Sequence, residues 1–308
     1  MISIIYSFKN ENKNIQTLID RTIKTCEKIN KTFEIIFVDD ASTDNSSEII
    51  KLNIKERSNI KYIRMTRTFG VGPCISAGLK FSSGELVVYL DADLQDPPEL
   101  IYEMYNKSLE GFDVIHTKRR IRKGENFFKL LLTKCAYYLL HKTLNVKIEK
   151  NSGDFKLLKR KVVNAVLNLG EKDPFLRALP NWTGYKNHTI LYDRERRYGG
   201  ETKFSLLKSL NPYKEIIRAV TSFSSFPLYF GIVFTIIGII ILILLFIFDF
   251  IFNFFKVNPM AYLIIFLFTF LQFSIGSIGI YIERILKYSN NRPEYIIEEV
   301  EGFQKKFL

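Results

Sequence analysis

The chain has 308 residues, of which 44 are Lys or Arg and 32 are Asp or Glu, giving a formal net charge of +12. Its three cysteines and three histidines are too few and too scattered for a disulfide framework or a zinc site, and they fit a reducing compartment. The length suffices for one sizeable α/β domain and a further segment. The basic excess predicts a phosphate-bearing partner, either a nucleic acid or an anionic membrane surface.

Short apolar runs alternate with helical patterns in the N-terminal part of the chain. We expect strands at 3–7, 33–38, 59–65, 85–90 and 113–116. Helices are expected at 14–30, 43–56, 73–81 and from Pro97 onward. Strands that alternate with helices predict an α/β fold with a mostly parallel sheet and right-handed crossovers. Ligands of such folds bind outside the carboxyl ends of the strands.

Acidic residues follow two of these strands at their carboxyl ends. Asp39 and Asp40 end the second strand, and Asp91 and Asp93 end the fourth, with Gln95 close behind. In an extended segment, the last three side chains would lie on one side and could offer three oxygens to Mg²⁺ or Mn²⁺. The first pair could accept hydrogen bonds from a base or ribose. Two acidic pairs at neighbouring strand ends therefore predict a cation-assisted site for a nucleotide-diphosphate donor.

Two apolar segments near the C-terminus are long enough to cross a bilayer. Residues 228–248 and 260–282 carry no charged side chain. A hydrocarbon core needs about 20 helical residues, and helices of a soluble core rarely lack a polar face over such a length. The short loop between the segments offers only Lys256 as a basic residue, whereas Arg218 and Arg284 flank the outer ends. We therefore expect a transmembrane hairpin with both chain termini on the cytoplasmic side of the cytoplasmic membrane.

The segment before the hairpin, residues 202–226, mixes apolar and basic side chains. It predicts amphipathic helices in the membrane interface, or else helices packed on the soluble domain. The expected organisation is a cytoplasmic domain at 1–201, interface helices at 202–226, a transmembrane hairpin at 227–284 and a cytoplasmic tail at 285–308.

Four segments resemble the inverting family 2 glycosyltransferases, and more narrowly the polyprenyl-phosphate glycosyltransferases. Phe37–Asp44 (FVDDASTD) is similar to the family's V-D-D-x-S-x-D, and Leu90–Glu99 (LDADLQDPPE) to its metal motif. Asn151–Phe155 (NSGDF) is similar to N-A-G-D-F, and Gly199–Phe204 (GGETKF) to A-G-E-S-K-Y. The resemblance extends over nearly the whole chain. It implies a GT-A-type, Rossmann-like domain followed by interface helices and two transmembrane helices.

The sequence departs from the family pattern at two places. The family's P-V-Y-N-E matches Asn10-Glu11 only if one residue is inserted, and R-N-x-G-K appears as Arg67–Val71 (RTFGV), without the Asn and the Lys. Both places lie near the nucleotide or the sugar in the family, so they bear on the identity of the donor.

The resemblance also implies roles for individual residues. The metal, Mg²⁺ or Mn²⁺, would be held by Asp91, Asp93 and Gln95. The nucleotide sugar would be bound by Glu11, Asp39, Asp40 and Asp91. The acceptor phosphate would be bound by Arg119, Arg120, Arg122 and Lys203, of which the individual residues could also form a solvated basic face. The catalytic set would be Asp154, Arg119 and Lys203, with Asp154 either a base or a buried structural carboxylate.

A polyprenyl phosphate acceptor is largely dianionic at pH 7, so the reaction needs cations more than it needs a base. We expect inverting transfer of a single sugar from a nucleotide-diphosphate donor, UDP-linked by resemblance, to a lipid such as undecaprenyl phosphate. A non-catalytic membrane adaptor with the same fold and a processive polysaccharide synthase are the alternatives. The basic residues cluster beside the apolar segments, which favours a lipid partner over nucleic acid. A homo-oligomer stays open.

Overall fold

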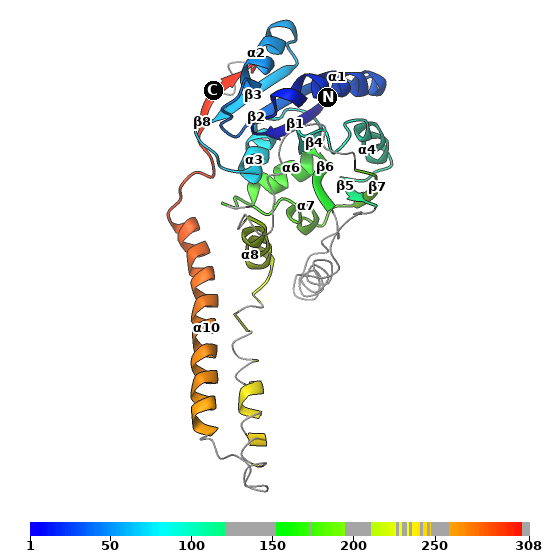
Figure 1. Cartoon of the computed structure of the whole chain (residues 1–308). Coiled ribbons are helices and arrows are strands. Elements are labelled where there is room, and N and C mark those ends of the chain that lie inside the picture. Colours follow the sequence, from blue (N-terminus) through cyan, green and yellow to red (C-terminus); the bar gives the residue numbers. More distant parts are fainter. Residues whose placement is uncertain are drawn as a thin grey trace. The chain divides into compact units, whose positions relative to one another are not determined.

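The structure is a computed structural model. It describes residues 1–120, 152–172, 174–194, 211–225 and 259–303, with short stretches between 228 and 247. These residues fall into two units (Figure 1). The first contains the described residues up to 215 together with those from Pro293 onward, and the second contains those from Ile216 to Arg292. Each unit is described by itself below.

An eight-stranded sheet forms the first unit, in the order β7-β5-β6-β4-β1-β2-β3-β8. Its strands are β1 (Ile2–Phe8), β2 (Phe33–Asp39), β3 (Ile60–Met65), β4 (Leu86–Asp91), β5 (Val114–Arg119), β6 (Ser152–Lys159), β7 (Asn187–Tyr192) and β8 (Ile297–Glu301). The strands β4, β1, β2 and β3 run parallel to one another, and β5 is parallel to β7. Two strands run against their neighbours, β6 between β4 and β5, and β8 beside β3.

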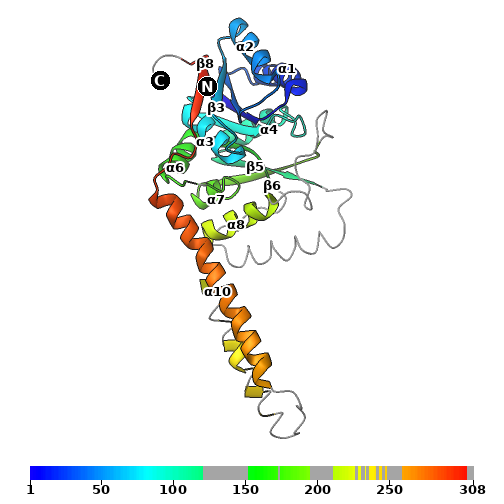
Figure 2. The same ribbon diagram turned by 60° about the vertical axis from the view of Figure 1, so that its left-hand side comes forward.

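Helices cover the sheet. They are α1 (Asn12–Ile29), α2 (Ser46–Glu56), α3 (Val71–Phe81), α4 (Leu100–Leu109), α6 (Arg160–Asn168) and α7 (Leu179–Trp182). The helix α1 lies beside α2 and α4, whereas α3 lies beside α6 and packs on β1 and β2. Figure 2 shows the first unit from a second direction. This double covering explains why all seven residues of β1 are buried, as is usual for a parallel sheet with helices on both faces.

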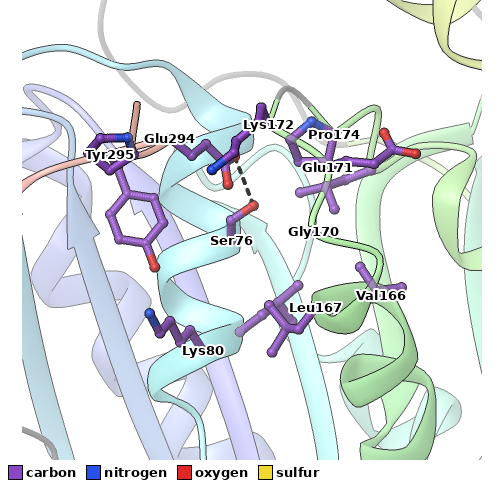
Figure 3. A pocket seen from close by; sticks show the side chains of 13 residues that line it. Ser76, Lys80, Val166, Leu167, Gly170, Glu171, Lys172, Pro174, Glu294 and Tyr295 are labelled. Carbon is purple, nitrogen blue, oxygen red and sulfur yellow. Dashed lines mark hydrogen bonds between the residues drawn. The ribbon is translucent and has the colours of Figure 1, made fainter. Parts of the chain in front are cut away.

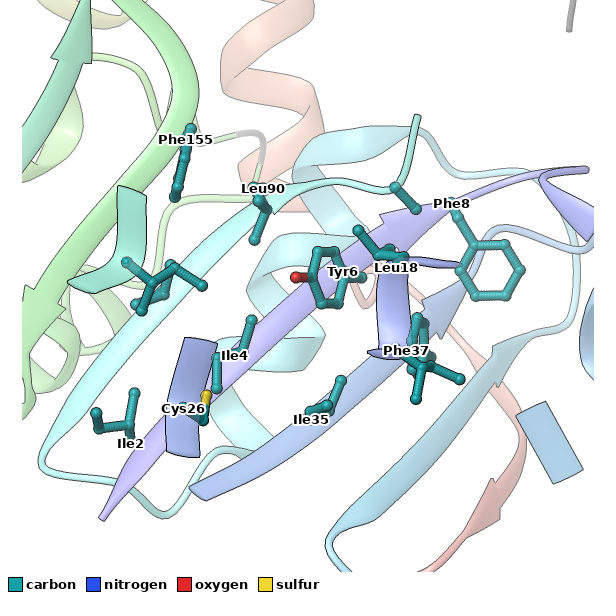
Figure 4. Packing of buried hydrophobic residues seen from close by; sticks show 14 of the residues in the cluster. Ile2, Ile4, Tyr6, Phe8, Leu18, Cys26, Ile35, Phe37, Leu90 and Phe155 are labelled. Atoms are coloured by element: carbon teal, nitrogen blue, oxygen red, sulfur yellow. The ribbon is translucent and has the colours of Figure 1, made fainter. Parts of the chain in front are cut away.

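The core lies where the central strands meet α1 (Figure 4). Tyr6 of β1 stacks on Phe37 of β2, with ring centroids 5.4 Å apart. One stripe of α1, including Ile15, Leu18 and Cys26, is buried against these strands. The central strands and α1 thus form an apolar core on this face of the sheet, and the carboxyl ends of the strands are left to carry polar side chains.

The five strands and the first helices predicted from the sequence are confirmed, and so is the mostly parallel α/β sheet. The sequence did not predict β6, β7 or β8. The last of these is notable because it adds residues 297–301, from the expected C-terminal tail, to the edge of the sheet.

The second unit contains α10 (Pro259–Ser289) and most of α8 (Asn211–Phe223). Within α10, Phe266–Ser289 is long and apolar enough to cross a membrane. The second predicted apolar segment therefore lies in a helix of the expected kind. The first, at 228–248, lies mostly outside the described residues, so the transmembrane hairpin stays a prediction. Within this unit, Tyr281 Oη donates a hydrogen bond to the Ser224 carbonyl at 2.5 Å, which ties α10 to the end of α8.

Candidate active site

The two predicted acidic pairs meet at one edge of the sheet. Asp39 of β2 lies opposite Phe8 of β1, and Asp91 of β4 lies opposite Ser7 on the other side of the same strand. The Ser7 hydroxyl is 3.5 Å from Asp91 Oδ1. The two carboxylates flank the carboxyl end of β1, one on each side. Their place at the same edge of the sheet follows from the parallel topology alone.

Asp39 is fully buried and already bonded to protein groups. Its Oδ1 accepts a hydrogen bond from the Ser42 amide at 2.7 Å, and its Oδ2 accepts one from the Tyr62 hydroxyl at 2.7 Å. The guanidinium of Arg64 lies 3.5 Å from the same Oδ2. Ala41, between these residues, has a φ of +57°, which is uncommon for a residue with a side chain. Asp39 therefore fixes the shape of the turn that follows β2.

Asp40 and Glu11 hold neighbouring loops at this edge. Asp40 Oδ1 accepts hydrogen bonds from the amides of Phe69 at 2.6 Å and Gly70 at 3.2 Å, at the start of α3. Glu11 Oε2 accepts one from Asn14 Nδ2 at 2.6 Å, at the start of α1. The predicted nucleotide-binding residues thus share one region, and each of these two carboxylates also orders a loop there.

The predicted metal residues follow β4 in a bend. The strand ends at Asp91, and Leu94 has a φ of +58°, so the expectation of an extended segment is wrong beyond Asp91. Asp93 Oδ1 instead accepts a hydrogen bond from the Gln95 amide at 3.1 Å, closing a short turn. Positive φ values of this kind are costly and concentrate at functional sites.

Asp91 has an unusual electrostatic environment. Burial first, and then the nearby carboxylates of Asp154, Asp93 and Asp96, raise its pKa to about 7, against the lowering effect of Arg177. Such a cluster of oxygens suits a hard cation, which would stabilise the ionised form of Asp91. Within the described residues, no group of three or more His, Cys, Asp or Glu side chains is arranged as a finished metal site.

Asp154, on β6, is a further carboxylate near Asp91. Its oxygens bind Arg177 in a bidentate pair, Nε to Oδ1 at 2.9 Å and Nη2 to Oδ2 at 2.8 Å. Although burial opposes ionisation, Arg177, Lys156 and Arg119 hold the pKa of Asp154 below its usual value. Arg177 precedes α7 and was not predicted from the sequence. No motif marks it, so only the fold identifies it.

Lys156 holds the segment that carries Arg177. It lies two residues after Asp154 on β6 and is fully buried. Its Nζ donates hydrogen bonds to the carbonyls of Leu176 at 3.0 Å and Arg177 at 2.5 Å. Burial lowers the pKa of Lys156 to about 7. The one sequence signal at this position is that Lys156 stands between the apolar residues Phe155 and Leu157.

The buried carboxylate of Asp96 contacts Tyr192, Arg194 and Arg119. It accepts hydrogen bonds from the Tyr192 hydroxyl and, at 3.1 Å, from Arg194 Nε. The Nη2 atom of Arg119 lies 4.0 Å from its other oxygen. Arg194 Nη2 is also 3.9 Å from Asp93 Oδ2. The predicted Arg119 thus lies in the cluster, because β5 and β7 are paired with Arg119 opposite Tyr192. Tyr192 and Arg194 were missed.

The remaining predicted basic residues are placed less centrally. The side chain of Arg120 is 58% exposed and forms a distant pair with Asp193 at 3.6 Å. Arg122 and Lys203 lie outside the described residues. The described site therefore contains four carboxylates, those of Asp91, Asp93, Asp96 and Asp154, beside the guanidinium groups of Arg119, Arg177 and Arg194.

Among solved structures, the fold is similar to that of the mannosyltransferase PcManGT from Pyrobaculum calidifontis in complex with GDP-Man and Mn²⁺. The TM-score is 0.50 at 16% sequence identity, and the match covers 72% of this chain and 63% of that one. This likeness concerns the fold alone.

Sequence relatives match the chain from end to end. The Bacillus subtilis protein named "Uncharacterized glycosyltransferase YkcC" is 35% identical over 99% of this chain and 96% of its own. The prophage bactoprenol glucosyl transferase homolog of Escherichia coli is 32% identical, over 97% and 99%. The undecaprenyl-phosphate 4-deoxy-4-formamido-L-arabinose transferase of Proteus mirabilis is 30% identical, over 99% and 95%. Residues 3–167 match the model described as glycosyl transferase family 2. The chain is therefore a glycosyltransferase that belongs to glycosyl transferase family 2, in its polyprenyl-phosphate subgroup.

Proposed function

We propose that this glycosyltransferase moves a single sugar from a UDP-linked donor to a polyprenyl phosphate such as undecaprenyl phosphate, with inversion and with Mg²⁺ or Mn²⁺. The cluster of carboxylates at the carboxyl ends of β2 and β4 carries this proposal, since it is the chemistry that a cation and a diphosphate require. End-to-end similarity to the bactoprenol and undecaprenyl-phosphate transferases supports the lipid acceptor.

Asp91, Asp93 and Gln95 would hold the metal ion. The donor set fits, because carboxylate and amide oxygens suit Mg²⁺ and Mn²⁺, and because Asp91, with a pKa of about 7, needs further positive charge to stay ionised at neutral pH. The bound metal would supply charge neutralisation for the diphosphate leaving group. Beside it, the turns that Asp39 and Asp40 order would receive the nucleotide.

Asp154 has a different role from that of a base. A carboxylate in a bidentate pair with Arg177 has a lowered pKa and accepts a proton poorly. A lipid phosphate arrives already ionised, so no group needs to deprotonate it. We infer that Asp154 holds Arg177, which together with Arg119 and Arg194 would bind the phosphates of donor and acceptor. Lys203 is proposed for the same task from the family motif.

The membrane placement completes the proposal. An apolar helix such as α10 would bring the domain to the surface where a polyprenyl phosphate lies. The basic residues at the outer ends of the apolar segments favour a cytoplasmic position for the domain and both chain termini, in the cytoplasmic membrane.

A transfer assay tests the function. Full-length protein in detergent would receive undecaprenyl phosphate, Mg²⁺ or Mn²⁺, and a panel of radiolabelled UDP- and GDP-sugars. We expect one donor to label the lipid, with loss of label in EDTA and in D93N. The matched control is D113N, whose carboxylate pairs with Lys159 and Lys161 instead of the site and should keep activity.

Three other outcomes would overturn the proposal. Full activity of D93N in the presence of EDTA would exclude metal dependence through Asp93. Labelled products with many sugars per lipid would indicate a processive synthase. A folded protein that binds nucleotide and yet labels no lipid with any donor would exclude the acceptor class and favour the adaptor.

A further inference from the structure

The strand β8 follows the apolar helix in the sequence, since it begins eight residues after α10 ends. It lies at the edge of the sheet beside β3 (Figure 2). The two strands pair in an antiparallel register that shifts within the strand. Arg64 lies opposite Glu299, whereas the next residue, Met65, lies opposite Ile297. Glu298 is therefore the extra residue of a β-bulge. Bulges bend a strand and redirect one side chain, and they are frequent beside active sites.

The redirected carboxylate reaches the predicted nucleotide site through one arginine. Glu298 Oε2 accepts a hydrogen bond from Arg64 Nε at 2.9 Å. The same guanidinium lies 3.5 Å from Asp39 Oδ2 through Nη1, and it donates to the Ser42 carbonyl at 3.2 Å through Nη2. Arg64 thus joins the bulge of β8 to the turn that Asp39 shapes after β2.

Other contacts keep the C-terminal segment in place without Glu298. The Ile296 carbonyl accepts a hydrogen bond from the Thr66 amide at 3.0 Å. Glu294 Oε1 accepts one from the Ser76 hydroxyl of α3 at 3.0 Å, at the edge of a pocket of about 310 Å³ that contains none of the predicted site residues (Figure 3). Loss of the Glu298 side chain should therefore leave the strand paired.

We propose that Glu298 is a positioning residue for the donor nucleotide, acting through Arg64 on the Asp39–Ser42 turn. This inference rests on the proposed function, because it takes that turn as part of the nucleotide site. It makes the segment after the apolar helix a contributor to donor binding. The pair is partly open to solvent, with 54% of the Glu298 side chain and 27% of Arg64 exposed, so the expected effect is modest.

The test compares two glutamates of the same strand. E298A in the full-length protein should raise the dissociation constant for UDP, and the KM for the UDP-sugar, about two- to fivefold, with kcat unchanged. E301A removes a comparable ion pair, with Lys51 at 3.2 Å instead of with Arg64, and should change neither constant. In an R64A background, E298A should have no further effect, because its influence passes through that arginine.

Each outcome decides a separate claim. Wild-type protein that binds neither UDP nor GDP, in parallel titrations with Mn²⁺, would overturn the proposed function and the inference with it. Wild-type binding with equal constants for E298A and E301A would overturn the inference alone. The inference would also fail if E298A weakened UDP binding equally with and without Arg64, since that would indicate a general effect of the strand.

Discussion

Protonation of His116 should weaken the fold as the pH falls. This side chain on β5 is buried, and its Nε2 is 2.5 Å from Asn181 Oδ1 of α7. Since Oδ1 only accepts, the proton of the neutral ring lies on Nε2, and Nδ1 has no hydrogen-bond partner in the described part of the chain. Burial, with Lys156 nearby, lowers the pKa of His116 to about 3.

The size of this effect follows from linkage. The folded-state pKa is depressed below the ordinary 6.5, so the unfolded chain binds the proton first. Stability is then complete above about pH 6.5 and is lost as the pH falls toward 3. Between pH 7 and pH 5 the loss is about 2 kcal/mol from this group. For a domain of this size, that corresponds to a decrease of about 5 °C in the unfolding midpoint.

The substitution H116Q isolates the contribution. A glutamine amide can still donate to Asn181, but it does not titrate. Fluorescence of Trp182, the one tryptophan of the chain and the neighbour of Asn181, would follow thermal unfolding at pH 7 and pH 5. We expect the midpoint of H116Q to fall less than that of the wild type. Equal decreases for the two proteins would refute the reasoning, because every other titrating group is shared.

Three further predictions follow from the contacts of the first unit. R177K should lower kcat at least tenfold with little change in the unfolding midpoint, because an ammonium group lacks the planar fork of N–H donors that fits the two oxygens of Asp154. Unchanged turnover would contradict this. Lys156, with its pKa near 7 in the fold, makes stability rise from pH 7 toward 10.5, by about 2 kcal/mol up to pH 9, and K156M should abolish that rise in denaturant titrations. G302A should lower the unfolding midpoint more than G111A, since both have a positive φ but only a Cβ at Gly302 would meet a carbonyl, at 2.6 Å.

The parallel core could be predicted from the sequence because its strands are short apolar runs separated by helical patterns. Each of β1 to β5 is such a run, and two of them end in acids. The meeting of Asp39 and Asp91 followed from the rule that parallel strands share a carboxyl edge. The prediction that Asp91 to Gln95 is extended was wrong. Leu94 adopts the left-handed conformation, which is uncommon for leucine and which no residue type at this position indicates.

The later strands could not be predicted, for two physical reasons. The sequence of β6 contains Asp154 and Lys156, and that of β8, IEEVE, contains three glutamates, so both read as solvated segments. Their charges are tolerated because each has a partner in the fold: Arg177, two carbonyls, and the cations of β3 and α2. The sheet order also differs from the chain order, and pairing between distant segments is invisible to a local pattern.

The charge balance of the site argues for a cation more strongly than any one motif does. In the described residues, four carboxylates stand beside three guanidinium groups and Lys156, whose pKa of about 7 leaves it only partly charged at neutral pH, so the carboxylates outnumber the cationic charge. Asp154 and Asp96 each bind arginine directly, whereas within the described residues Asp91 has only the Ser7 hydroxyl, at 3.5 Å, as a hydrogen-bond donor. Burial and, after it, the neighbouring carboxylates raise its pKa to about 7, so Asp91 binds a proton readily at neutral pH. A divalent ion would replace that proton, so Mn²⁺ binding to the folded protein should release protons near pH 7, and D91N should abolish that release.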